Sequence, residues 1–215
     1  MGALSTRQAT QESPVLTWGV AAAAHPGEAV SGDLHVVQAW RDGALVAVVD
    51  GIGHGTEAAV AARRAVTTAT QHAGESVITI VRRCHEALIG TRGVAMSVAS
   101  FNVADHTMSW LGIGNVEGVL VRADPRADPQ EEAILLRSGV VGLQLPLLKA
   151  SVTAVAPGDV LVMATDGLAP SCVARLTPTG PPQAFAEQLL ARHRRGTDDA
   201  LVLVAHYRGN TPGEP

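Results

Sequence analysis

Short apolar runs, separated by turns rich in glycine, proline and aspartate, occupy most of the chain. Many of these runs are rich in β-branched residues, which favours strands over helices. Arg41-Asp42-Gly43 separates two of them and is typical of a hairpin turn. The pattern predicts strands at 16–23, 33–40, 44–49, 94–103, 108–112, 116–122, 134–137, 151–155, 160–164 and 200–207.

Two adjacent segments change to the period of a helix, and a third follows late in the chain. The segment 56–72 carries alanines at helical spacing, which allow a helix to lie close to a sheet. Glu75-Ser76 then begins a second helix, whose apolar stripe runs from Val77 to Leu88 and includes Cys84. A third helix is predicted at 182–193.

The order of these elements predicts an α+β fold, because most strands follow one another in hairpins and do not alternate with helices. We expect one domain over residues 15–208, since no internal repeat or interdomain linker is visible. Residues 1–14 are expected to form a flexible leader, and residues 209–215 a disordered tail.

Composition and charge narrow the class of protein. In a chain of 215 residues, 47% are apolar and 17% charged, which is typical of a globular domain. The formal net charge is -4 and basic residues form no block, so we expect no nucleic-acid partner. No apolar run approaches the ~18 residues of a membrane helix, so we expect no membrane partner. Two cysteines are too few for a disulfide framework, and we expect a cytoplasmic monomer.

Acidic residues recur where predicted strands begin or end. Asp33 and Asp198 begin strands, while Asp50 and Asp166 follow strands and are themselves followed by glycine. An aspartate-glycine pair alone usually marks a turn. Four carboxylates at one edge would repel one another unless cations lay between them, and their oxygens suit Mg²⁺ or Mn²⁺. The run from Asp50 to Gly55 is stronger evidence, because its three glycines cost chain entropy unless the backbone needs them.

These motifs, in this order, resemble the metal-dependent serine/threonine phosphatases of the PPM superfamily. The chain is most similar to their SpoIIE-type branch, and within it to the short stand-alone phosphatases of the stressosome. Supporting segments lie at 92–97, 114–116 and 138–139. The resemblance is carried by Gly32-Asp33, Asp50-Gly51-Ile52-Gly53-His54-Gly55, Thr165-Asp166-Gly167 and Asp198-Asp199.

The resemblance implies a β-sandwich flanked by helices, in α-β-β-α layers, with two Mn²⁺ or Mg²⁺ ions at one end. By analogy, Asp50 bridges both ions and Gly51 offers its carbonyl oxygen. Asp166 and Asp198 bind one ion, and Asp33 acts directly or through a water. A hydroxide between the ions would then hydrolyse phosphoserine or phosphothreonine. The implied partners are small phosphorylated regulatory proteins of a stressosome or partner-switching pathway.

His54 has two interpretations. It is either a catalytic residue that protonates the leaving alkoxide or touches substrate, or a polar residue at a helix start. Larger eukaryotic relatives carry their histidine directly after the aspartate-glycine pair, where this chain has Ile52. No arginine in this chain matches the phosphate-binding arginine of those relatives.

Two other classes of function compete with the phosphatase. The loop Asp50-Gly51-Ile52-Gly53 is superficially similar to the adenine-binding loop of GHKL-type ATPases and kinases. Those proteins also need an upstream helix that bears a metal-binding asparagine, and no asparagine precedes Asp50. The other alternative is a catalytically weak phosphatase fold that acts as a binding module.

Overall fold

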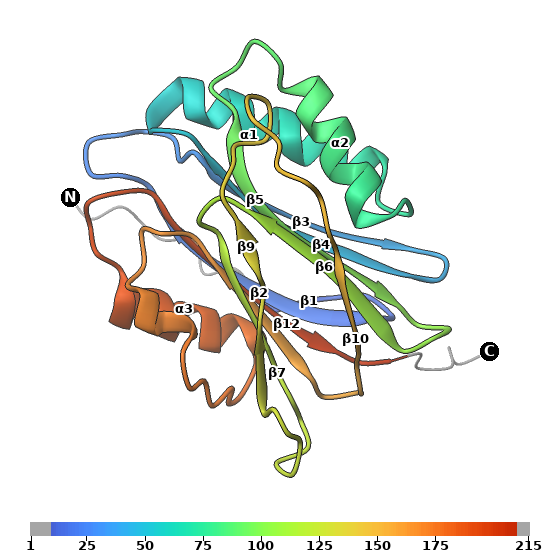
Figure 1. Ribbon diagram of the computed structural model, residues 1–215. Helices are drawn as coiled ribbons and strands as arrows, with labels where there is room; N and C mark the ends of the chain where they lie inside the picture. The colour runs from blue at the N-terminus through green and yellow to red at the C-terminus, as the bar shows by residue number, and fades with distance from the viewer. Residues whose placement is uncertain (1–9, 210–215) are drawn as a thin grey trace.

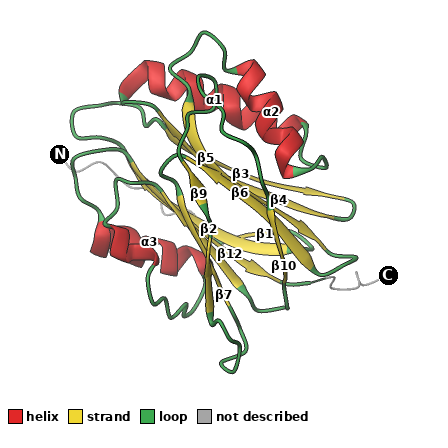
Figure 2. Ribbon diagram, viewed as in Figure 1, coloured by secondary structure: helices red, strands yellow, loops and turns green. Residues whose placement is uncertain are grey.

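Two six-stranded sheets are stacked face to face, and helices cover their outer faces (Figures 1 and 2). The computed structural model describes residues 10–209, so the predictions for residues 1–9 of the leader and 210–215 of the tail lie outside the described residues. The four layers confirm the predicted α+β sandwich. In the described part of the chain, no helix is long and apolar enough to cross a membrane.

One sheet is built around the C-terminal strand and is antiparallel throughout. Its strands, in spatial order, are β1 (Gln11–Glu12), β2 (Leu16–Ala23), β12 (Ala200–Tyr207), β11 (Val160–Ala164), β7 (Glu117–Val121) and β8 (Glu131–Ala133). α3 (Pro182–His193) covers its outer face, and the 3₁₀ helix η1 (Pro170–Val173) precedes α3.

The other sheet ends at a strand with a free edge, β3 (Asp33–Trp40). Inward from β3 follow β4 (Gly43–Gly51), β5 (Val94–Asn102), β6 (Thr107–Ile113) and β10 (Ser151–Ala154), while β9 (Leu136–Arg137) pairs in parallel with β6. α1 (Gly55–Gln71) and α2 (Val77–Ala87) lie over the outer face of this sheet (Figure 1).

Close packing of α1 fixes the loop that precedes it. The buried face of α1 is made mainly of alanines, including Ala58, Ala62 and Ala65. A Cβ atom on Gly51 would lie 2.3 Å from the Ala58 carbonyl oxygen, so only glycine allows this approach. The end of β4 is therefore pressed directly against the first turn of α1.

Most predicted elements are confirmed. β2, β3, β11, β12 and α3 have the predicted bounds, and the remaining predicted elements overlap observed ones. Ordered structure begins earlier than expected, because Gln11–Glu12 pairs with β2 as β1. β8 and η1 were not predicted. The GHKL alternative is wrong, because the described residues before Asp50 form only strands and loops, without the helix such a protein needs.

Candidate metal centre

Two of the predicted ligands lie opposite each other on adjacent strands. Asp33 begins β3 and Asp50 lies near the end of β4, and the strand register pairs them directly. Their neighbours Gly32 and Gly51 continue this alignment, since the Gly51 N–H donates to the Gly32 carbonyl over 3.1 Å. Hairpin pairing therefore brings together two carboxylates that are separated in sequence by a turn and two strands.

Thr165 fixes the Asp33 carboxylate from the opposite sheet. Its Oγ1 donates to Asp33 Oδ2 over 2.7 Å and accepts from the Leu201 N–H over 2.9 Å. Thr165 directly follows β11, and Leu201 lies in β12. The hydroxyl thus ties the ends of three strands together and places Asp166, the next residue, at the same end of the sandwich.

Asn115 is a site residue whose role the sequence analysis missed. Residues 114–116 were predicted only as a segment that supports the family resemblance, with no role in the site, but Asn115 Nδ2 donates to Asp166 Oδ2 over 2.6 Å. Asn115 Oδ1 is buried without a hydrogen-bond partner among the described residues. An amide oxygen of this kind, between carboxylates, suits a cation or a water.

Burial and mutual repulsion make the paired aspartates reluctant to ionise. Burial, followed by the charge of Asp50, raises the pKa of Asp33 to about 8. Burial, followed by the charge of Asp166, raises the pKa of Asp50 to about 7, although a hydrogen bond from Asn115 acts in the opposite direction. Asp198 and Asp199 add to the negative field around Asp50. Asp33, Asp50 and their acidic neighbours therefore form a cluster of mutually repelling carboxylates, which is called the acidic cluster below.

Asp198 and Asp199 have different surroundings. Asp199 is buried, and its carboxylate accepts from the backbone N–H groups of His25 over 2.7 Å and of Gly32 over 2.8 Å. Asp199 thus holds the chain that enters β3. Asp198 is only half-buried, and one of its oxygens accepts from the Asp199 N–H. Asp198, the more accessible of the two, is the one predicted from the sequence to bind a metal.

The donor set fits hard divalent cations. Oxygen atoms of Asp33, Asp50, Asp166 and Asp198, with the amide oxygen of Asn115, are the ligands that Mg²⁺ and Mn²⁺ prefer. Within residues 10–209, however, no three acidic, histidine or cysteine side chains are already drawn together as a preformed cage. Cations would have to draw these carboxylates inward, which their repulsion otherwise opposes.

His54 lies at the start of α1, next to the acidic loop. Its Nδ1 is 2.8 Å from Glu28 Oε1, and its ring stacks on His25 with centroids 4.5 Å apart. The Glu28 carboxylate also lies against Gly55, where a Cβ atom would be 3.0 Å from Oε2. His54 thus has Glu28 as an acidic partner and stacks on the His25 ring. Neither contact was predicted from the sequence.

The layered fold and the acidic end of its strands are the arrangement that the sequence analysis expected of the PPM class of metal-dependent phosphatases. A family model described as Stage II sporulation protein E (SpoIIE) matches residues 41–208, and the chain belongs to this family. The resemblance predicted from the sequence is thereby confirmed.

Individual proteins similar to this chain agree with this family assignment. The chain is 28% identical over 94 residues to "Phosphoserine phosphatase RsbX" of Bacillus subtilis (strain 168), an alignment that spans 44% of this chain and about half (47%) of the relative. A structure described as "The bacterial stressosome: a modular system that has been adapted to control secondary messenger signaling" is 26% identical, with a TM-score of 0.80, over 89% of this chain and 99% of the other. The fold also matches RsbX in complex with magnesium, at 22% identity and a TM-score of 0.82, over 93% and 98% of the two chains.

Proposed function

We propose that this chain hydrolyses phosphoserine or phosphothreonine on small regulatory proteins of a stressosome or partner-switching pathway, acting as a monomer in the cytoplasm. The observation that carries the proposal is the acidic cluster around Asp33 and Asp50 in a PPM fold, where burial and like charge raise both pKa values. The similarity to an RsbX phosphatase and to a stressosome structure supports the class of substrate.

Two Mn²⁺ or Mg²⁺ ions are the proposed cofactors. In this proposal Asp50 would hold both ions, Asp166 and Asp198 would hold one, and Asp33 would bind directly or through a water, with the Gly51 carbonyl oxygen as a further ligand. When bound, such ions supply an acidified water as nucleophile and positive charge for the phosphoryl oxygens.

The protein's own groups orient this chemistry. Thr165 donates a hydrogen bond to the Asp33 carboxylate and Asn115 to that of Asp166, and these bonds would orient both carboxylates toward bound cations. In this proposal His54 would protonate the leaving alkoxide. Because the Glu28 carboxylate can only accept, His54 Nδ1 carries the proton of their hydrogen bond, and Nε2 is the nitrogen left to exchange a proton.

Metal removal tests the proposal. The full chain, stripped with EDTA, is expected to release no phosphate from phosphoserine peptides or from 4-nitrophenyl phosphate. Adding Mn²⁺ or Mg²⁺ in excess of the chelator is expected to restore the activity. Turnover that survives exhaustive chelation would contradict the two-metal proposal. Tight phosphopeptide binding without turnover at any metal concentration would instead favour the binding module.

A further inference from the structure

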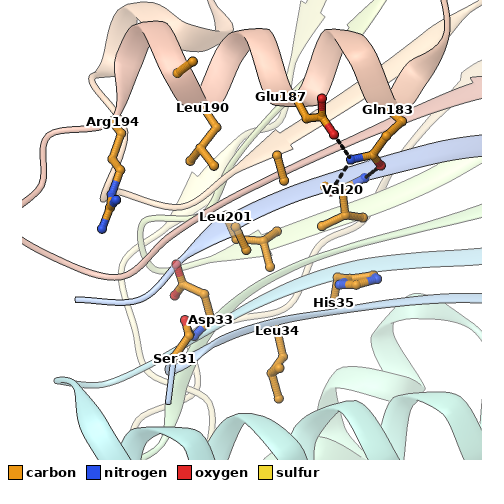
Figure 3. Close-up of a pocket in the computed structure, with 13 residues that line it drawn as sticks. Val20, Ser31, Asp33, Leu34, His35, Gln183, Glu187, Leu190, Arg194 and Leu201 are labelled. Atoms are coloured by element: carbon orange, nitrogen blue, oxygen red, sulfur yellow. Dashed lines mark hydrogen bonds between the residues drawn. The ribbon is translucent and has the colours of Figure 1, made fainter. Parts of the chain in front are cut away.

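A groove of about 710 Å³ opens beside the acidic cluster, between the two sheets and α3. Its lining includes Asp33 and His35 of β3, Ala22 of β2, and Leu190 and Arg194 of α3 and its C-cap. Figure 3 shows Asp33 and Arg194 at the same end of the groove, with Glu187 and Gln183 at the other. The groove therefore leads along the strands to a predicted metal ligand.

The β3 wall of this groove offers unpaired backbone groups. The bond from the Gly51 N–H to the Gly32 carbonyl sets the alternation of the antiparallel pair, so odd-numbered β3 residues direct their N–H and C=O away from β4. β3 is the last strand of its sheet in the described part of the chain. His35, which lines the groove, and Val37, farther along β3, thus present backbone donors and acceptors that an added strand can use.

A basic turn borders the same end of the groove. We define it as Arg192, His193, Arg194 and Arg195, which link α3 to the loop before β12. The Arg195 N–H donates to the Gly167 carbonyl over 2.9 Å, and the Ala169 N–H donates to the His193 carbonyl over 2.9 Å. These bonds place the basic turn next to Asp166.

The cations of the basic turn are available to a partner. Arg192, Arg194 and Arg195 are exposed, and within residues 10–209 none of them forms an ion pair. Within residues 10–209, the Arg194 side chain donates to a single acceptor, the Ala24 carbonyl, over 2.7 Å. At the other end of the groove, Glu187 accepts from the Gln183 side chain over 3.1 Å. The groove thus has the cations of the basic turn beside its Asp33 end and the Glu187 carboxylate at its other end.

We infer that this groove is a docking site for an extended, acidic segment of the phosphoprotein substrate. The segment adds to the free edge of β3, and its acidic side chains, next to the phosphorylated residue, face the basic turn. The inference rests on the proposed function and adds the chemistry by which a protein substrate is recognised. A small phosphate ester, which has no such segment, makes none of these contacts.

Charge reversal in the basic turn tests the electrostatic part. The probes are a phosphoserine peptide flanked by glutamates, the same peptide with glutamines in their place, and 4-nitrophenyl phosphate. In the full chain, Arg192→Glu with Arg195→Glu is expected to raise KM for the glutamate peptide about tenfold at low salt, with little change in kcat. KM for 4-nitrophenyl phosphate is expected to stay within about twofold, because exposed charges act weakly on a small ester.

The matched control is Arg41→Glu with Arg82→Glu. It makes the same change in net charge, because it too replaces two arginines by glutamates. Both of these arginines are exposed, and Arg41 lies at the far end of β3 from Asp33. It is expected to leave the preference for the glutamate peptide intact. Equal losses in both double variants, or a wild type that does not distinguish the two peptides, would overturn the inference.

Backbone methylation of the peptide tests the added strand. If the peptide pairs with β3, methylating every second amide weakens binding at least about tenfold, whereas methylating the alternate amides leaves it within about twofold. Fluorescence anisotropy of labelled peptides measures this binding without turnover. Docking can therefore be refuted even if no phosphate is released, and failure of the proposed function is seen separately as inactivity on all three probes.

Discussion

At the scale of single residues, the sequence predicted where the aspartates of the candidate site lie, but not which other side chains contact them. The positions of Asp33, Asp50, Asp166 and Asp198 were predictable, because each lies at or close to the end of a strand and strand ends follow from the apolar pattern. The roles of Asn115 and Glu28 were not predictable, because each depends on a contact with a distant segment. Asn115 lies in a turn and meets Asp166 only when β7 and β11 pair.

Asp50→Asn tests the central carboxylate. We expect turnover to fall at least about a thousandfold. A neutral amide can neither bridge two cations nor provide the negative charge that balances theirs. The metal-free protein is expected to fold, because the substitution removes a negative charge that the neighbouring carboxylates repel. Phosphate release and urea unfolding, compared with Asp42→Asn in the exposed hairpin turn, measure both effects. A folded variant with wild-type rates would exclude the role.

His54→Ala separates proton donation from a structural role. A general acid typically contributes about 10²–10⁴-fold, and mainly for poor leaving groups. We therefore expect a large loss on a phosphoserine peptide and a small one on 4-nitrophenyl phosphate. Glu28→Gln, which keeps a hydrogen-bond acceptor but removes the charge, is expected to show the same selectivity to a lesser degree. Similar losses on both substrates, accompanied by weaker metal binding, would show that His54 only shapes the loop.

Elements were predictable where their period extends over many residues. The alanines of α1 predicted both a helix and its close approach to a sheet, and six alanines of its buried face have no exposed surface. The short elements β1, β8 and η1 carry too few residues for a periodic signal. Their positions come from neighbours, as when Thr17 and Trp18 of β2 pair with β1.

Ala62→Leu tests the packing of α1. Ala62 is fully buried between α1 and the sheet, so a larger side chain must push the helix outward. We expect the free energy of unfolding to fall by about 1–3 kcal/mol, read from urea denaturation. Thr67→Leu places the same side chain on an exposed position of α1 and is expected to change stability by less than about 0.5 kcal/mol. Equal stability of the two variants would show that α1 has room to move.

At the scale of the whole molecule, the fold buries the acidic cluster at a cost in stability that bound cations would relieve. Two sheets, joined by the Thr165 hydroxyl, bury Asp33 at the same end of the sandwich as Asp50. This arrangement was predictable only in outline. The order of motifs placed the aspartates at strand ends, but which strand ends meet depends on the pairing of β12 between β2 and β11.

Stability should therefore depend on pH and on metal together. In the folded state the pKa of Asp33 is raised to about 8 and that of Asp50 to about 7, from 3.8 for an ordinary aspartate. At pH values between the ordinary and the raised pKa, the folded protein binds more protons than the unfolded chain. The free energy of unfolding therefore falls as pH rises. The metal-free protein is expected to lose at least about 1 kcal/mol between pH 6.5 and 8. That window lies above the ordinary pKa of histidine and below that of cysteine, 6.5 and 9.0.

Comparison with Asp33→Asn isolates the effect, because every other titrating group is common to both proteins and the amide still accepts from Thr165. In EDTA, the urea midpoint of the wild type should fall with rising pH more steeply than that of the variant. With saturating Mn²⁺ the slope of the wild type should vanish or reverse, because cations bind the ionised carboxylates and so favour the deprotonated folded state. Parallel slopes for the two proteins in EDTA would mean that Asp33 ionises normally. The fold would then bury its carboxylates without the repulsion that makes this end of the sandwich a candidate metal centre.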